Sequence, residues 1–125
     1  MTSIVVADDE ADILDSMQLV LAMEGFGVTT VQDPKLILAT LRRVRPDILL
    51  QDINMPGLDI AKHIRDVRAD PKLKGLRILV FTASVDSEAI NQALATDSFV
   101  QKPFDANRIK ETLDRHMAKK AKGGA

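Results

Sequence analysis

Short apolar runs alternate along this chain with amphipathic stretches, and this alternation constrains the possible folds more than any other feature. The apolar runs are Ile4-Val5-Val6-Ala7, Val28 to Val31, Ile48-Leu49-Leu50, Ile78-Leu79-Val80-Phe81 and Phe99-Val100. Between them, apolar residues recur at the three- and four-residue spacing of helices that cover a core. Buried strands that alternate with such helices are typical of a parallel sheet covered on both faces. The pattern therefore predicts the α/β class.

Five such units follow one another, so we expect a five-stranded, doubly wound parallel sheet with five helices. The helical stripes are carried by Ile13, Met17, Val20 and Leu21; Ile37, Leu41 and Val44; Ile60, Ile64 and Val67; Ile90, Ala93 and Leu94; and Ile109, Leu113 and Met117. The run 28–31 is the poorest in apolar residues and suits a sheet edge. We expect one domain over residues 1–120 and a flexible tail over 121–125.

Composition excludes several classes of function. The chain has no cysteine, which rules out disulfides, thiolate zinc sites, iron–sulfur clusters and a cysteine nucleophile. Seventeen basic and eighteen acidic residues leave a net charge of −1, so we expect neither direct nucleic-acid binding nor membrane binding. No apolar run approaches the roughly 18–20 residues of a membrane span, and the start does not resemble a signal peptide. These features predict a cytoplasmic location.

Polar side chains follow four of the expected strands at the point where each strand ends. Asp8 and Asp9 follow the first strand, Asp52 the third, Thr82 the fourth and Lys102 the fifth. In such sheets, ligands bind at the carboxyl ends of the strands. Converging carboxylates repel one another and require a cation, and oxygen ligands without His or Cys suit Mg²⁺ or Mn²⁺. The hydroxyl and the lysine are suited to binding the oxygens of a phosphoryl group.

Each of these residues also has a simpler structural interpretation. Asp9 alone is suited to capping the first helix, and Asp52 alone to starting an Asx turn. A coincidence of five such residues at one edge is harder to explain, so we favour a site. His63 and His116 lie in expected helices without a second metal ligand, and we expect solvated or half-buried side chains there.

Four motifs, in this order and spacing, resemble the receiver domain of two-component response regulators, the CheY-like family. They are Ala7-Asp8-Asp9-Glu10, Leu50-Gln51-Asp52-Ile53-Asn54-Met55-Pro56-Gly57, Phe81-Thr82-Ala83 and Lys102-Pro103-Phe104. The resemblance extends from Ile4 to about Met117. It implies the flavodoxin-like fold with strand order 2-1-3-4-5.

The resemblance also implies a role for each matching residue. Asp52 corresponds to the phosphoacceptor, and Thr82 and Lys102 to the groups that bind the phosphoryl oxygens. Mg²⁺ is implied as the cofactor, with Asp8, Asp9, Asp52 and the backbone carbonyl of Asn54 as its ligands. Thr82 and Phe99 correspond to the switch residues.

The function implied is that of a stand-alone response regulator. It accepts a phosphoryl group on Asp52 from a sensor histidine kinase or a histidine phosphotransfer protein. A downstream protein then reads the face made by the fourth helix, fifth strand and last helix. The chain would be no enzyme beyond catalysing its own phosphorylation and dephosphorylation.

Two other functions remain open at this point. A haloacid-dehalogenase-like phosphohydrolase also uses an aspartyl phosphate, but its Asp-x-Asp motif lies near the first strand, whereas Asp52 follows the third and Asn54 replaces the second Asp. A degenerate receiver that acts only as a scaffold is the other. A flavin-binding protein is less well supported, because no Ser/Thr-rich phosphate loop follows the first strand.

Overall fold

The computed structural model describes residues 2–82, 90, 92, 94, 96–101, 110–112, 114 and 115. Its strands are β1 (Ser3–Ala7), β2 (Gly27–Val31), β3 (Ile48–Asp52), β4 (Arg77–Thr82) and β5 (Ser98–Gln101). The α-helices with defined bounds are α1 (Ala11–Met23), α2 (Ile37–Val44) and α3 (Ile60–Ala69), and short 3-10 helices span Pro34–Leu36 and Pro71–Leu73. The chain thus alternates strand and helix through α3, as its hydrophobic pattern predicts.

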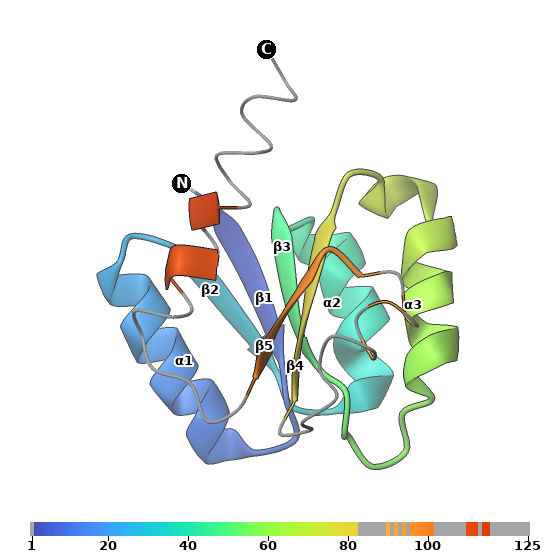
Figure 1. Cartoon of the computed structure of the whole chain (residues 1–125), viewed down its shortest axis with the longest axis horizontal. Coiled ribbons are helices and arrows are strands. Elements are labelled where there is room, and N and C mark those ends of the chain that lie inside the picture. Colours follow the sequence, from blue (N-terminus) through green and yellow to red (C-terminus); the bar gives the residue numbers. More distant parts are fainter. Residues whose placement is uncertain are drawn as a thin grey trace.

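The strands form one parallel sheet in the order β2-β1-β3-β4-β5 (Figure 1). This confirms the parallel sheet, its order and the edge position of β2. Ala7, the last residue of β1, pairs with Gln51 of β3, and Asp52 pairs with Phe81 of β4. All five strands therefore end at the same edge of the sheet.

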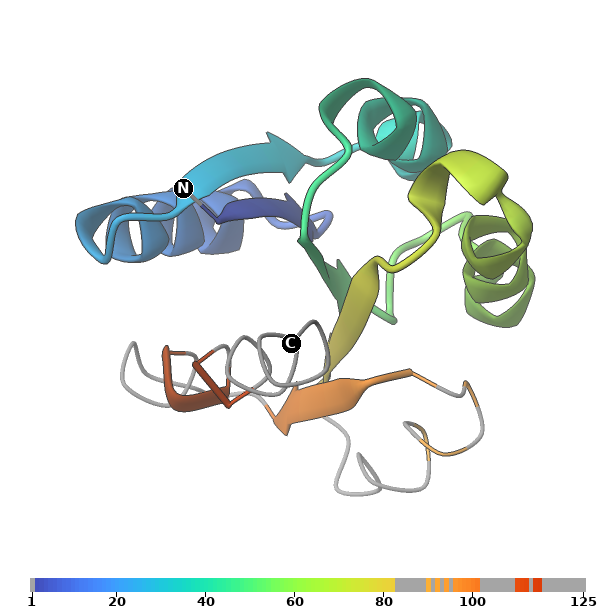
Figure 2. The ribbon, with the colours of Figure 1, turned by 90° about the horizontal axis from the view of Figure 1, so that it is seen from above.

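Helices cover both faces of the sheet, with α1 on one side and α2 and α3 on the other (Figure 2). Successive β1 residues point to opposite faces, so Ile4 and Val6 join the core on the α1 side while Val5 joins the other. Against these strands pack Leu14, Met17 and Leu21 of α1, Ile37 and Leu41 of α2, and Ile64 and Val67 of α3. Burial of each such side chain contributes about 1.5–3 kcal/mol, which makes the two clusters the main source of stability.

The second helical segment differs from a single helix starting at Pro34. It begins as a 3-10 turn, because the Asp33 carboxylate accepts a hydrogen bond from the Lys35 N–H (2.9 Å) and Pro34 has no N–H. Regular α-helix starts only at Ile37. The helix ends at Val44, because the next residue, Arg45, precedes Pro46 and a residue before proline disfavours the α conformation; Arg45 has a left-handed backbone (φ 49°).

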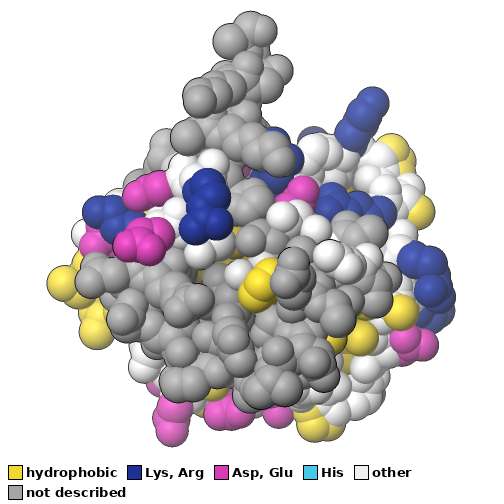
Figure 3. Space-filling view, in the orientation of Figure 1, with side chains coloured by type: hydrophobic (Ala, Val, Ile, Leu, Met, Phe, Trp, Pro, Cys, Tyr) yellow, Lys and Arg dark blue, Asp and Glu magenta, His cyan; other side chains and the backbone are white. Residues whose placement is uncertain are grey.

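Parts of the last two expected helices are also seen. Residues 90, 92 and 94 are helical, as are 110–112, 114 and 115. The rest of these helices, Lys102, His116 and the expected tail lie outside the described residues. Within the described part of the chain, no helix is both long enough and apolar enough to cross a bilayer. In Figure 3, basic and acidic side chains of the described residues both occur on the upper part of the face, whereas its lower edge carries acidic ones.

Candidate functional site

Two buried carboxylates lie at the carboxyl ends of neighbouring strands. Asp8 directly follows β1 and Asp52 ends β3, and both lie one residue beyond the Ala7–Gln51 pair. The side chains are almost inaccessible, because Asp8 is 0% and Asp52 3% exposed. Buried carboxylates are rare unless they are paired, hydrogen-bonded or bound to a cation. This edge of the sheet is therefore the candidate site.

An acidic cluster stands beside Asp8. One carboxylate oxygen from each of Asp8, Asp9 and Glu10 lies within 4.8 Å of the others. Burial decreases along the three, from the buried Asp8 to the partly buried Asp9 and the exposed Glu10. Asp52 is not a member of this cluster. Oxygen ligands of this kind suit Mg²⁺, so the donor set fits that ion.

Glu10 is an acidic neighbour that our sequence analysis did not assign to the metal site. The signal was present in the run Asp8-Asp9-Glu10, but a residue at the start of a helix is usually explained by the helix dipole. The structure brings its carboxylate to the same point as the other two because the Glu10 N–H donates to Asp8 Oδ1 at 2.8 Å. That bond closes a tight turn between β1 and α1.

The turn is also held to the neighbouring strand. The Asp8 N–H donates to the Val31 carbonyl (3.1 Å), and the Gln32 side chain donates to the Asp9 carbonyl (3.1 Å). Glu10, not Asp9, occupies the N-cap of α1, and it makes no side-chain capping bond. The interpretation of Asp9 as a helix cap is therefore wrong.

Asp52 begins a turn into the loop that joins β3 to α3. The Asn54 N–H donates to Asp52 Oδ1 at 3.3 Å, which is the Asx-type contact expected for Asp52. The loop continues through the buried Met55 and turns at Gly57, where φ is +82° and a side chain would be strained. Asn54 itself is exposed, so its backbone lies at the surface beside the buried Asp52.

The remaining predicted site residues are only partly described. Thr82 ends β4 and pairs with Gln101, the last residue of β5. Lys102 follows Gln101 but lies outside the described residues. Phe99 is half-buried on β5, opposite Val80. The backbone thus brings the end of β4 to the end of β5, while the contacts of Thr82 and Lys102 remain predictions.

His63 is not the solvated or half-buried residue that we expected. It is 8% exposed, and its Nε2 lies 3.0 Å from Oε1 of Gln51, which is fully buried beside Asp52. Burial lowers the pKa of His63 below its ordinary value of 6.5, and the nearby Asp66 carboxylate only partly offsets this. Sequence reasoning missed this pair because a polar residue at a strand end and a histidine on a helix give no joint signal.

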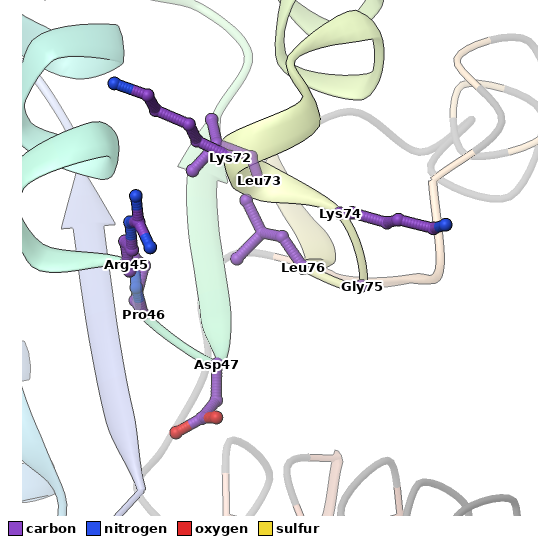
Figure 4. Close-up of a pocket in the computed structure, with 8 residues that line it drawn as sticks. All are labelled: Arg45, Pro46, Asp47, Lys72, Leu73, Lys74, Gly75 and Leu76. Atoms are coloured by element: carbon purple, nitrogen blue, oxygen red, sulfur yellow. The ribbon is translucent and has the colours of Figure 1, made fainter.

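A separate cavity of about 200 Å³ lies between the segments that precede β3 and β4 (Figure 4). Arg45, Asp47, Lys72 and Lys74 are among the residues that line it. Because these residues precede the two strands, the cavity lies at the amino edge of the sheet, opposite Asp8 and Asp52. It is not part of the candidate site.

Known proteins are similar to this chain in sequence and in fold. The family described as the response regulator receiver domain matches residues 4–114. Protein RcaC of Microchaete diplosiphon is 34% identical over 121 residues, which cover 92% of this chain and 19% of that protein. The DNA-binding response regulator MtrA of Mycobacterium tuberculosis is 33% identical over 108 residues, which cover 85% of this chain and 46% of that protein. The chain therefore spans half or less of these relatives.

Solved structures agree with this match. The chemotaxis response regulator CheY4 of Vibrio cholerae is 26% identical, with a TM-score of 0.84 over 92% of this chain and 98% of that one. The receiver domain of the sensor histidine kinase PA1611 from Pseudomonas aeruginosa, with magnesium in its active-site cleft, is 24% identical and has a TM-score of 0.82 over 91% and 95% of the two chains.

These matches bear directly on the expectations from the sequence. The comparisons favour neither the phosphohydrolase nor the scaffold. We expected no nucleic-acid partner from the net charge of this chain. The MtrA relatives, however, are DNA-binding proteins, so the comparisons do not support that expectation. With the flavodoxin-like fold, the acidic cluster and a family match over residues 4–114, the chain belongs to the receiver domains of two-component response regulators.

Proposed function

We propose that this receiver accepts a phosphoryl group on Asp52 in a reaction that depends on Mg²⁺. The observation that carries the proposal is the place of Asp52. Its carboxylate is buried at the end of β3, next to the strand end that leads into the acidic cluster of Asp8, Asp9 and Glu10. A nucleophile in this position is shielded from bulk water while a cation beside it can offset its charge.

Mg²⁺ would be held by Asp8, Asp9, Asp52 and the backbone carbonyl of Asn54. Asp8 and Asp9 belong to the 4.8 Å cluster, the donor set consists of oxygen atoms alone, which suits this ion, and magnesium occupies the cleft of the PA1611 receiver. When bound, the ion supplies positive charge that reduces repulsion between the carboxylates and the incoming phosphoryl oxygens. We place Glu10 at the margin of this site because its carboxylate is exposed.

The chemical step is a phosphoryl transfer to the carboxylate. An ionised Asp52 oxygen forms the new bond to phosphorus while the bond between phosphorus and the donor histidine nitrogen breaks. The electron pair of that bond remains on the imidazole, which leaves in its neutral form after protonation. The donor would be a sensor histidine kinase or a histidine phosphotransfer protein. Water then attacks the acyl phosphate, which releases inorganic phosphate and returns the Asp52 carboxylate. In this proposal the chain catalyses only its own phosphorylation and dephosphorylation.

Phosphorylation would be read at a distance from Asp52. The phosphoryl group adds close to two negative charges and three acceptor oxygens. Thr82 is the last residue of β4, and Lys102 comes directly after β5 in the sequence; both would bind these oxygens. Phe99, half-buried on β5, would change its position with Thr82 and alter the surface made by the fourth helix, β5 and the last helix.

The proposal is tested with acetyl phosphate and Mg²⁺ by intact mass measurement. The wild-type protein should gain one phosphoryl group only when Mg²⁺ is present, and Asp52→Asn should gain none. Asp47→Asn is a matched control because Asp47 lies at the opposite end of β3 and accepts a hydrogen bond from the Ser3 N–H. The proposal would be refuted if Asp52→Asn took up a full phosphoryl group, or if the wild-type protein took one up equally well after Mg²⁺ had been chelated.

A further inference from the structure

Gln51 is an unusual residue for the interior of a parallel sheet. It is 0% exposed and follows Ile48, Leu49 and Leu50 in a strand that is buried throughout. A buried carboxamide without hydrogen bonds destabilises a protein, so its polar atoms must be satisfied. Its side chain lies on the face that α3 covers, one residue before the proposed phosphoacceptor.

The carboxamide connects three parts of the molecule. Its Nε2 donates to the backbone carbonyl of Asp52 (2.8 Å) and contacts Met55 Sδ (3.4 Å). Its Oε1 lies 3.0 Å from Nε2 of His63 on α3. One side chain thus contacts both ends of the segment 52–55 and joins that segment to a helix.

The direction of these bonds follows from chemistry. A backbone carbonyl only accepts, so the Gln51 nitrogen must face Asp52 and its oxygen must face His63. His63 Nε2 must then carry a hydrogen and donate it, which fixes the Nε2–H tautomer of the neutral ring. The low pKa of His63 agrees with a neutral ring at pH 7.

We propose that Gln51 and His63 are positioning residues for the metal and phosphoryl site. They hold the backbone of residues 52–55, and with it the Asn54 carbonyl, in the geometry that binds Mg²⁺. This inference rests on the proposed function. Two hydrogen bonds from backbone N–H groups fix the ends of this connection. The backbone N–H of Asn54 donates to the Asp52 carboxylate, and the backbone N–H of His63 donates to the Asp59 carbonyl (2.9 Å) in the first turn of α3. Movement of His63 would therefore be passed to the loop through Gln51.

A double substitution distinguishes a positioning role from a purely structural one, because the two roles affect stability and Mg²⁺ affinity differently. Gln51→Leu leaves the imidazole Nε2–H of His63 without its acceptor, so it should lower the free energy of unfolding. In Gln51→Leu/His63→Leu both partners of the Gln51–His63 hydrogen bond are replaced by apolar groups, which is often nearly neutral. Stability should then recover in part, because the Asp52 carbonyl still lacks the hydrogen bond from Gln51 Nε2. Mg²⁺ affinity, measured by calorimetric titration, should remain about five- to tenfold weaker than in the wild type in both variants.

Thr40→Val is the matched control. It removes a side-chain hydrogen bond of another buried polar residue on the same side of the sheet, from the Thr40 hydroxyl to the Leu36 carbonyl (2.8 Å), without touching the loop after β3. Its Mg²⁺ affinity should equal that of the wild type. If the double variant also binds Mg²⁺ like the wild type, the positioning role is wrong.

Two further results keep the outcomes distinct. A wild-type protein that neither binds Mg²⁺ nor takes up a phosphoryl group would refute the proposed function itself, whereas a wild-type protein that does both, with unaffected Gln51 variants, would refute only this inference. Imidazole ¹⁵N shifts of the wild-type protein do not depend on any variant folding. They should show the Nε2–H tautomer of His63, and the Nδ1–H tautomer would overturn the inference.

Discussion

Individual residues at the end of β1 differ in what they can contribute to a cation site. Asp9 is partly buried, so its carboxylate is held near Asp8, whereas Glu10 is exposed and its charge is screened by solvent. We predict that Asp9→Ala weakens Mg²⁺ binding at least about tenfold, or about 1.4 kcal/mol, and that Glu10→Gln weakens it much less. Calorimetric titration of the two variants measures their Mg²⁺ affinities. If both substitutions weakened binding equally, Glu10 would be as much a part of the metal site as Asp9.

The buried His63 makes stability depend on pH. Its folded-state pKa lies below the ordinary value of 6.5, so the unfolded chain binds the proton more readily than the folded one. The stability that the neutral ring provides is therefore complete above pH 6.5 and is lost as the pH falls through the folded-state pKa. We predict that denaturant unfolding loses less stability between pH 7.5 and pH 5 in His63→Leu than in the wild type. Identical pH dependence would contradict the assigned burial.

Sequence reasoning at the residue scale succeeded where chemistry and position agreed. The Asp8-Asp9 pair directly follows one apolar run and Asp52 comes two residues after another, so the ends of the strands predicted where they lie. Gln51 and His63 are 12 residues apart on different elements, and their contact depends on how α3 packs against β3. The spacing of apolar residues contains no information on such a contact, so we could not predict a role for Gln51 or His63 from the sequence.

At the scale of elements, one carboxylate ties α3 to the start of β4 and β5. Asp97 accepts hydrogen bonds from the Ile78 N–H (2.7 Å) and from Arg68 of α3 (2.9 Å), and Arg77 lies 3.7 Å away. Burial raises the pKa of Asp97, but these donors outweigh burial and the net pKa is lowered. The stability that Asp97 provides is thus present above its ordinary pKa of 3.8 and is lost as the pH falls through the lower folded-state value.

We predict that Asp97→Asn costs about 1–3 kcal/mol of unfolding free energy, because it removes the charge from two hydrogen bonds that join three elements. Asp66→Asn is the control, since it breaks the exposed Lys62–Asp66 pair within α3 and its charge matters little to His63 while that ring is neutral at pH 7, so it should cost about 0.5 kcal/mol or less. Denaturant unfolding at pH 7 measures both. Equal losses would show that Asp97 does not join these elements.

At the scale of the whole molecule, alternating hydrophobic periods were sufficient to predict the parallel sheet. The edge position of β2 also followed, because its apolar content is low. The 3-10 start before α2 did not follow, because capping by Asp33 and the missing N–H of Pro34 act locally and leave the apolar stripe unchanged. The spacing of apolar residues predicts which face of a helix or strand is buried, whereas local hydrogen bonds determine how a helix begins.

Cation binding should stabilise the entire fold, because the folded chain assembles a site that the unfolded chain lacks. At a Mg²⁺ concentration ten times the dissociation constant, the free energy of unfolding should rise by about 1.4 kcal/mol. Thermal unfolding with Mg²⁺ and with a chelator measures this shift. Asp9→Ala should show a much smaller shift at the same concentration, and an equal shift would locate the binding elsewhere.

The central claim is that Asp52 carries the phosphoryl group, and direct chemical mapping tests it most sharply. Borohydride reduces an acyl phosphate of aspartate to homoserine, which changes the mass of one residue permanently. After treatment with acetyl phosphate and Mg²⁺, reduction and proteolysis, peptide mass analysis should find homoserine at position 52. Homoserine at another aspartate, such as Asp8 or Asp9, or an unreduced phosphoryl group on a hydroxyl or imidazole, would contradict the account.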